Sequence, residues 1–195
     1  GFDTQAIAVS VTNVNEAPLI TSDGGGATAS VSAAENQTAV TTVTSTDVDG
    51  GTNVYSIAGG ADAALFTIDA STGVLRFTAA PNFEATSDSG GNNVYDVTVQ
   101  VADGNGGFDT QAIAITVTNA NEAPVITSGA AVSVAENQTA VATVTSADID
   151  GAAPTYTISG GADATLFSID SVTGALTFNT APNFELPADA GGNSV

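Results

Sequence analysis

The sequence contains no histidine, cysteine, methionine or tryptophan, and its only basic residue is Arg76, against 21 aspartates and glutamates. Without a basic patch the chain cannot neutralise phosphates, which excludes nucleic-acid binding and attraction to anionic membranes. Without histidine or cysteine it lacks the ordinary base for nucleophilic catalysis and the ligands of a tetrahedral zinc site. The composition therefore predicts a protein that is not an enzyme, and it leaves hard cations bound by oxygen as the possible metals.

Long apolar runs are also missing. No stretch approaches the roughly 18 consecutive apolar residues of a transmembrane helix, so we expect no membrane insertion in this segment. The sequence has neither an initiator methionine nor a signal peptide, and we interpret it as an internal segment of a longer protein.

What the sequence does contain is a repeat over its entire length. Gly1–Ala8 recurs 106 residues later as Gly107–Ala114, and Glu35–Val40 recurs 101 residues later as Glu136–Val141. The difference of five residues is a loop insertion, Asp23–Ala27, in a glycine-rich stretch that tolerates extra length. A repeat of about 100 residues has the size of a whole domain, which predicts domains in series.

Within one repeat the apolar residues alternate with polar ones, as in half-buried strands. Tyr95, Val97, Val99 and Val101 show this pattern, and so does the segment that contains Ile7, Val9 and Val11. Further short strands are expected near Val31 and over 39–44, 54–57, 65–68 and 74–78, separated by Gly, Asp and Asn turns. About seven such strands predict an all-β fold, an immunoglobulin-like Greek-key β-sandwich.

The expected core of the first full repeat contains Phe66, Ile68, Leu75, Phe77, Tyr95, Val97 and Val99, and in the second the corresponding residues are Phe167, Ile169, Leu176 and Phe178. The repeat pattern divides the chain into three parts. Residues 1–17 match the last strand of a preceding repeat plus a linker, and residues 18–119 match a complete repeat. Residues 120–195 match a second repeat, truncated before its last two strands.

Four acidic motifs recur at corresponding places, each in a predicted turn. They are Ala34-Glu35-Asn36, Asp47-Val48-Asp49-Gly50, Asn82-Phe83-Glu84 and the linker Asn13-Val14-Asn15-Glu16-Ala17-Pro18, with second copies at 135–137, 148–151, 183–185 and 119–124. Taken singly, Asp-x-Asp-Gly is more typical of a surface turn and the linker of a polar connection. Asp103, in a glycine-rich hairpin turn, has no second copy. The shared order and period of the motifs favour a joint role.

Together, these motifs resemble the calcium-binding motifs of cadherin repeats, in particular the cadherin-like tandem repeats of large bacterial calcium-dependent adhesins of the type I secreted, RTX-type family. The resemblance covers the whole chain and implies tandem cadherin-like β-sandwiches with Ca²⁺ at each junction between repeats. Asn82 and Asn119 stand where that family usually has Asp, and the linker is one residue shorter. These departures predict two ions at a junction, or three with a weak third.

The resemblance also implies the ligands. One complete junction is expected to use Glu35, Glu84, Asn119, Asn121, Glu122, Asp148 and Asp150. A partial junction, which lacks the glutamates of a preceding repeat, is expected to use Asn15, Glu16, Asp47, Asp49 and Asp103. Electrostatics agree, because carboxylates crowded together with no Lys or Arg nearby repel one another unless a cation joins them. Mixed carboxylate, amide and carbonyl oxygens suit Ca²⁺ better than Mg²⁺.

The resemblance implies an extracellular location, secreted or on a bacterial cell surface, and partners in the neighbouring repeats of the same chain. We expect calcium-rigidified spacer repeats that support cell adhesion or biofilm formation, with a host or matrix surface bound by regions outside this segment. A second hypothesis is a filament subunit, in which residues 1–13 add to the incomplete sandwich at 124–195 of an identical chain. A third is a carbohydrate-binding repeat, against which the absence of tryptophan argues.

Overall fold

The computed structural model describes residues 1–191. They form two compact units, Gly1–Ala120 and the described residues from Asn121 onward, which are called unit 1 and unit 2 below and are described separately. Regular structure is almost entirely β, as the alternating pattern predicts. Helical turns are limited, within residues 1–191, to three short 3₁₀ turns, η1 (Ser22–Gly24), η2 (Ala63–Leu65) and η3 (Ala164–Leu166).

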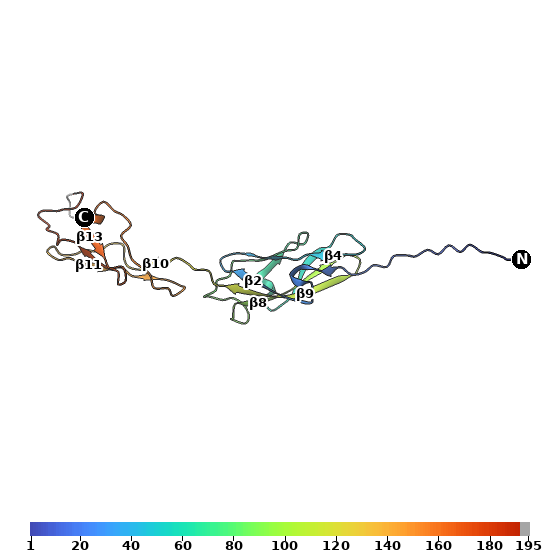
Figure 1. Cartoon of the computed structure of the whole chain (residues 1–195). Helices are drawn as coiled ribbons and strands as arrows, with labels where there is room; N and C mark the ends of the chain where they lie inside the picture. The colour runs from blue at the N-terminus through green and yellow to red at the C-terminus, as the bar shows by residue number, and fades with distance from the viewer. Residues whose placement is uncertain (192–195) are drawn as a thin grey trace. The chain divides into compact units, whose positions relative to one another are not determined.

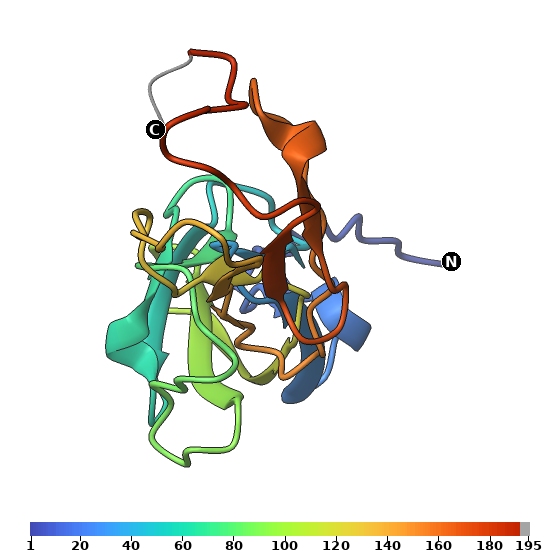
Figure 2. The ribbon, with the colours of Figure 1, turned by 90° about the vertical axis from the view of Figure 1, so that its left-hand side faces the viewer.

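Unit 1 is a two-layered β-sandwich (Figure 1). Its strands are β1 (Leu19–Ile20), β2 (Thr28–Ala34), β3 (Ala39–Thr42), β4 (Ser45–Thr46), β5 (Val54–Gly59), β6 (Phe66–Ile68), β7 (Val74–Phe77), β8 (Val94–Ala102) and β9 (Phe108–Thr118). One main sheet has the order β2-β9-β8-β5, in which β2 runs parallel to β9, and the other has the order β3-β7-β6. The short strands β1 and β4 pair with each other in a separate two-stranded sheet. The long hairpin β8–β9, yellow-green in Figures 1 and 2, forms the centre of the first sheet.

The core of unit 1 lies between these sheets. Tyr95, Val97, Val99 and Val101 point inward from β8 and are at most 1% exposed, which confirms the predicted alternation. Phe66, Leu75 and Phe77 are buried opposite them, and Ile68 is partly buried against the same cluster. The rings of Phe77 and Tyr95 are 5.2 Å apart in an edge-to-face arrangement, a geometry that aromatic pairs prefer.

Unit 2 repeats only part of this arrangement. Its strands are β10 (Val125–Ile126), β11 (Ala140–Thr143), β12 (Ser146–Ala147), β13 (Phe167–Ile169) and β14 (Ala175–Phe178). The order β11-β14-β13 matches β3-β7-β6, and the 4.7 Å separation of the Phe167 and Phe178 rings matches the 4.6 Å between Phe66 and Phe77. Within residues 121–191, no strand corresponds to β2, β5, β8 or β9.

The expected core of unit 2 is therefore only half-buried. Phe167, Ile169, Leu176 and Phe178 all keep intermediate exposure. The reason lies in the opposite sheet, because in unit 1 residues of β8 and β9 cover this face. The segment around Val132 corresponds to β2 and does not form a strand either. In unit 1, β2 is hydrogen-bonded to β9, and residues 121–191 contain no counterpart of β9.

Residues 1–17 were expected to contain a strand, and the structure shows none there. Ile7, Val9 and Val11 are 77%, 82% and 92% exposed. A strand is stabilised by a ladder partner and by burial of one face, and this segment has neither. Its sequence pattern nevertheless matches that of β9.

The same tight turn joins β6 to β7 in unit 1 and β13 to β14 in unit 2. Gly73 has φ +71°, and a Cβ placed on it would lie 2.1 Å from the Val43 carbonyl oxygen. Gly174 has φ +70° and the same 2.1 Å approach to the Val144 carbonyl oxygen. Only glycine fits such a position, because a side chain would clash with backbone and would sit in a left-handed conformation.

The carboxylate of Asp69 stabilises this turn in unit 1. Its Oδ1 accepts hydrogen bonds from the Ser71 hydroxyl at 2.7 Å, the Thr72 N–H at 2.8 Å and the Ser71 N–H at 3.0 Å. These bonds favour the ionised form and hold the pKa of Asp69 well below its ordinary value, the Ser71 hydroxyl contributing most. In unit 2, the Thr173 and Val172 N–H groups lower the pKa of Asp170 in the same way.

This turn gives a prediction for acid stability. A folded-state pKa below the unfolded one stabilises the fold at pH values above the unfolded pKa, and the contribution disappears as the pH falls toward the folded pKa. We expect Asp69→Asn to lower the melting temperature at pH 7 and the difference from the unsubstituted chain to shrink between about pH 5 and pH 2. Melts at a series of pH values measure this, with the exposed Asp3→Asn as control. A difference that stays constant with pH would contradict the assignment.

Candidate metal centre

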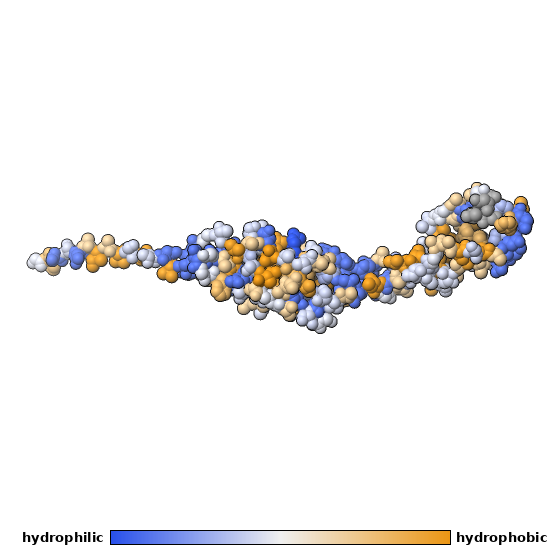
Figure 3. Space-filling view, turned by 180° about the vertical axis from the view of Figure 1, so that it is seen from behind, coloured by the Kyte–Doolittle hydropathy of each residue, from blue (hydrophilic) through white to orange (hydrophobic). Residues whose placement is uncertain are grey.

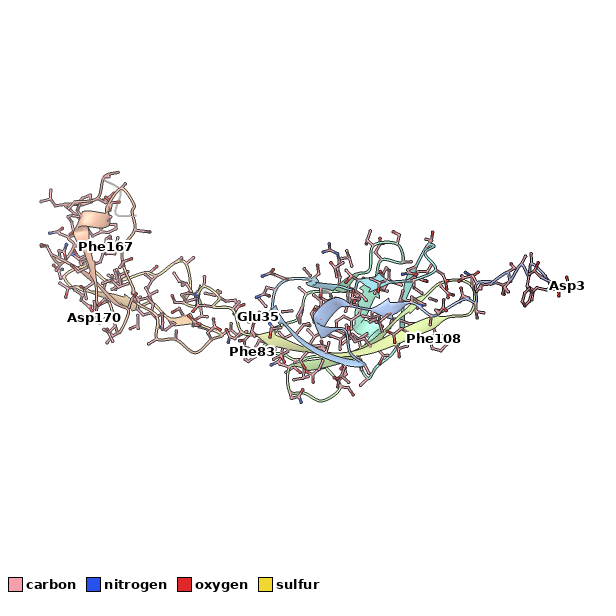
Figure 4. All side chains as sticks on the ribbon, turned by 45° about the vertical axis from the view of Figure 1, so that its right-hand side comes forward. Asp3, Glu35, Phe83, Phe108, Phe167 and Asp170 are labelled. Carbon is pink, nitrogen blue, oxygen red and sulfur yellow. The ribbon has the colours of Figure 1, made fainter. Side chains whose placement is uncertain are left out.

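Glu35 lies one residue after the end of β2 and is only 1% exposed. Its Oε2 accepts the Phe83 N–H at 2.8 Å and its Oε1 accepts the Ala120 N–H at 2.9 Å. The chain can turn here because Asn36, at φ +60°, tolerates the left-handed conformation, and its N–H donates to the Pro81 carbonyl at 3.0 Å. Figure 4 shows Glu35 and Phe83 together at one end of unit 1.

Glu84 lies beside Glu35 within unit 1. The two residues offer carboxylate oxygens within 4.8 Å of each other. Glu84 Oε1 accepts a hydrogen bond of 3.0 Å from the Asn119 side-chain amide, whereas Oε2 is buried and has no hydrogen-bond partner among residues 1–191. A buried carboxylate oxygen without a partner is costly, and a neighbouring carboxylate adds repulsion. A cation between the two carboxylates would offset the cost of the unpartnered oxygen and the repulsion between the two charges.

The opposite end of unit 1 holds the predicted partial junction; Phe108, labelled in Figure 4, marks this end. Asp49 Oδ1 accepts the Asn13 side-chain amide at 2.5 Å, and its Oδ2 accepts the Glu16 N–H at 2.6 Å. Asp47 Oδ1 accepts the Asp49 N–H at 2.9 Å, closing the Asp-x-Asp turn that Gly50 completes at φ +71°. These bonds aim the carboxylates of the turn at the linker.

Asp103 joins the same end from the β8–β9 hairpin. Its Oδ2 accepts the Asn15 side-chain amide at 2.7 Å. Its Oδ1 accepts the N–H groups of Asn105 and Gly107 at 2.7 and 3.0 Å, which confirms the predicted hairpin turn. All five residues predicted for the partial junction therefore gather with Asn13 at this end.

The ionisation of this cluster reflects its crowding. The Asp49 carboxylate, by hydrogen bonding and by its charge, raises the pKa of Glu16. The Asn13 amide and then the Glu16 N–H lower the pKa of Asp49. The Asn15 amide lowers the pKa of Asp103. The opposite pKa directions of Glu16 and Asp49 show that their negative charges repel, and a bound divalent cation would relieve that repulsion.

Unit 2 carries the same turn. Asp150 Oδ2 accepts the Glu122 N–H at 2.7 Å and Asp148 Oδ1 accepts the Asp150 N–H at 3.0 Å, compared with 2.6 and 2.9 Å in unit 1. The Asn121 amide donates to the Glu122 carbonyl at 2.8 Å. Asp150 Oδ1 is buried and unpartnered within the described part of the chain. The repetition shows that this geometry is built into the motif.

The residues predicted for the complete junction thus form two groups. Glu35, Glu84 and Asn119 belong to unit 1, and Asn121, Glu122, Asp148 and Asp150 belong to unit 2. Each group is assembled by hydrogen bonds within its own unit. How the two groups combine stays a prediction.

Two buried carboxylates were missed by the sequence analysis. Asp62 accepts the N–H groups of Ser89 and Asp96 at 2.7 and 2.8 Å, and Asp88 accepts those of Asn92 and Asn93 at 3.0 and 3.1 Å. They hold the loop before β8 against that strand. For Asp62 a signal existed, since Gly-Ala-Asp-Ala recurs at 60–63 and 161–164.

Part of this chain matches a known family of proteins. Residues 28–118 match the family model described as the cadherin domain. The structure is similar to human protocadherin-24 EC1-2 in its form II crystal (21% identity, TM-score 0.54, 87% of this chain and 80% of that one). It is also similar to human CDH23 EC21-23 (18% identity, TM-score 0.51, 90% of this chain and 58% of that one). These two likenesses show the fold, a cadherin-like β-sandwich.

The chain spans 57% of the length of mouse cadherin-23 EC22-24, to which it is 23% identical over 88% of its own length, with a TM-score of 0.45. No curated protein sequence matches the chain. Over residues 1–191, no helix is both long enough and apolar enough to cross a membrane.

Proposed function

We propose that this chain consists of extracellular spacer repeats, stiffened by Ca²⁺ at their ends, from a bacterial surface adhesin. The observation that carries the proposal is the pair Glu35 and Glu84. These side chains place carboxylate oxygens within 4.8 Å of each other, in a chain whose only basic side chain is Arg76. Oε2 of Glu84 is also buried and has no hydrogen-bond partner among residues 1–191. The donors are oxygens alone, which fits Ca²⁺ by the chemistry of the set.

The linker brings the second group of ligands within reach. The Ala120 N–H is bonded to Glu35, and Glu122 follows only two residues later. Consecutive Cα atoms are about 3.8 Å apart, so Glu122 starts within about 8 Å of Ala120 however the units are oriented. The Glu122 N–H is in turn bonded to Asp150. A cation held by Glu35 and Glu84 can therefore take further oxygens from the start of the next repeat.

In this proposal Glu35, Glu84, Asn119, Asn121, Glu122, Asp148 and Asp150 hold the ions of the complete junction. Asn15, Glu16, Asp47, Asp49 and Asp103 hold those of the partial junction. The bound ion neutralises carboxylates that otherwise repel, and it connects two repeats through a short linker. Asn82 and Asn119 stand where cadherin repeats usually have Asp, which lowers the negative charge of the ligands. We therefore propose two ions at a junction, or three with a weak third.

The sites match an extracellular role. Extracellular calcium modules bind with dissociation constants of about 10⁻⁴ to 10⁻³ M, so the sites would be empty in the cytosol and filled outside the cell. The repeats then act as a non-enzymatic stalk that supports adhesion or biofilm formation. Contact with a host or matrix surface is assigned to regions beyond this segment.

Small-angle X-ray scattering with Ca²⁺ and with EGTA tests the proposal. We expect the chain in Ca²⁺ to scatter as units of fixed relative orientation, and the chain in EGTA to scatter as two units joined by a flexible linker. The matched variant is Asp150→Asn, which removes one ligand charge while keeping an oxygen acceptor for the Glu122 N–H, and it should need more Ca²⁺ for the same change. Identical scattering in Ca²⁺ and EGTA would sink the idea.

A further inference from the structure

The hairpin turn between β8 and β9 contains an asparagine that the proposed metal site does not use. Asn105 is followed by Gly106, and it is the only asparagine in the sequence that precedes a glycine. Asn105 is exposed, and among residues 1–191 no hydrogen bond holds its side-chain amide. The turn lies at the end of unit 1 that adjoins residues 1–17, where Figure 3 shows hydrophilic residues in blue.

An asparagine followed by glycine is chemically less stable than other asparagines. The backbone nitrogen of the next residue can attack the side-chain amide carbon, and a Cβ on that residue hinders the attack. Gly106 has no Cβ, and its φ of +106° belongs to a backbone conformation that other residues rarely adopt. No atom lies within 4 Å of the place that a Cβ on Gly104 or Gly106 would take, so the turn is open on both sides of Asn105.

We propose that Asn105 is a site of spontaneous deamidation. The Gly106 nitrogen forms a bond to Cγ of Asn105, the bond from Cγ to Nδ2 breaks, and the amide leaves as ammonia with the proton of the Gly106 nitrogen. The product is a five-membered succinimide ring. Water then opens the ring at one of its two carbonyls and leaves either aspartate or isoaspartate at position 105. Each product carries one negative charge that the amide lacked.

Neighbouring asparagines are less suited to this reaction. Asn92 is also exposed and lies in a loop, but its Oδ1 accepts the Val94 N–H at 3.0 Å and the next residue is Asn93. The Asn93 amide donates to the Phe83 carbonyl at 2.8 Å, and Asn93 precedes the β-branched Val94. Asn92 is therefore the internal reference for an exposed asparagine without a following glycine.

The modification falls on the turn that positions Asp103. Oδ1 of Asp103 accepts the N–H groups of Asn105 and Gly107 at 2.7 and 3.0 Å, and Oδ2 accepts the Asn15 amide at 2.7 Å. Isoaspartate adds one methylene to the main chain between the first two of these N–H groups, so they no longer converge on one oxygen. Aspartate adds the charge and leaves the length of the main chain unchanged.

Deamidation therefore has a consequence for calcium, which rests on the proposed function. Asp103 is one of the proposed ligands of the partial junction. Isoaspartate at position 105 displaces this carboxylate, and we expect it to weaken calcium binding at that end of unit 1 by at least threefold. Aspartate keeps the carboxylate in place and should not weaken binding. Calcium affinity at this end of unit 1 thus falls slowly with the age of the protein.

Peptide mass spectrometry tests the modification. A protease that cleaves after aromatic residues releases peptide 96–108, in which Asn105 is the only asparagine, and peptide 84–95, which contains Asn92 and Asn93. After days at neutral pH, we expect the fraction of 96–108 that has changed from amide to acid to be at least tenfold larger than that of 84–95. Asn105→Gln should stay unchanged, because the same attack would have to close a six-membered ring. Equal conversion of the two peptides, or no conversion at Asn105, overturns the inference.

Calcium titration of fresh and aged chains tests the consequence. The isoaspartate form, separated by chromatography, should bind Ca²⁺ more weakly than the fresh chain, whereas Asn105→Asp should bind at least as tightly. Aged Asn105→Gln controls for other effects of age and should bind as the fresh chain does. Equal isotherms for the isoaspartate form and the fresh chain overturn the calcium step and keep the modification. A fresh chain that binds no Ca²⁺ overturns the proposed function, whereas the peptide masses still decide the deamidation.

Discussion

The melting temperature of unit 1 is expected to rise by roughly 10 to 20 °C when 10 mM Ca²⁺ replaces EGTA. With a dissociation constant of about 10⁻⁴ M, this concentration is about 100-fold above it and stabilises the fold by about 2.7 kcal/mol. For a domain of this size, 1 kcal/mol shifts the midpoint by about 4 to 8 °C. The physical source is the relief of repulsion between Glu35 and Glu84 at one end and within the Glu16 and Asp49 pair at the other.

The control for this experiment is Mg²⁺ at the same concentration. Mg²⁺ requires a tighter octahedral site and gives up its water reluctantly, so it should produce a much smaller shift. Coincident melting curves in Ca²⁺ and EGTA would contradict the calcium assignment. Equal shifts of the melting temperature with Ca²⁺ and Mg²⁺ would show that the stabilisation comes from general screening of charge.

Glu35→Gln is expected to have the largest effect of any single substitution at the site. Both carboxylate oxygens of this buried side chain accept backbone N–H groups, those of Phe83 and Ala120. A glutamine offers one acceptor, and its NH₂ group would face the second N–H, leaving a buried donor unsatisfied. We expect the free energy of unfolding of unit 1 in Ca²⁺ to fall by about 2 to 4 kcal/mol.

The same substitution should matter less in EGTA, because it also removes one of two repelling charges. The difference between the two conditions is the coupling of Glu35 to calcium. Glu136→Gln is the matched control, since Glu136 is exposed and accepts one N–H, from Phe184. Urea denaturation of the two variants in Ca²⁺ and EGTA measures these quantities. Equal losses for both variants would show that Glu35 has no special role.

Much of unit 1 could be predicted from its sequence because the local alternation of apolar and polar residues agrees there with the strand pairing of the fold. Period-two alternation identified the inward residues of β8, and Arg76 is exposed between the buried Leu75 and Phe77, as expected. The same reasoning was wrong for the strand at residues 1–13 and for the buried core of unit 2. Alternation shows that a segment is suited to form a strand with one buried face. The strand itself forms only where a ladder partner and an opposing sheet are present.

For the candidate site, the acidic motifs and their repetition could be identified from the sequence. The arrangement of these motifs in space depends on hydrogen bonds that only the structure shows. Asp-x-Asp-Gly does not say which oxygen faces the linker, but the Glu16 N–H selects Oδ2 of Asp49 and the Glu122 N–H selects Oδ2 of Asp150. The hydrogen-bond partners of Glu35 could not be inferred either, because one of them, the Phe83 N–H, is 48 residues away. Long-range backbone donors decide such roles, and local sequence does not display them.

Calorimetric titration of Ca²⁺ into the EGTA-stripped and dialysed chain tests the central claim most directly. The account predicts saturable binding of at least two ions per chain in the range of about 10⁻⁴ to 10⁻³ M, with one class of sites lost or weakened at least tenfold in Glu35→Gln. It predicts no such change in Glu136→Gln. Absence of saturable binding, or the same isotherm for Glu35→Gln and the unsubstituted chain, would contradict it.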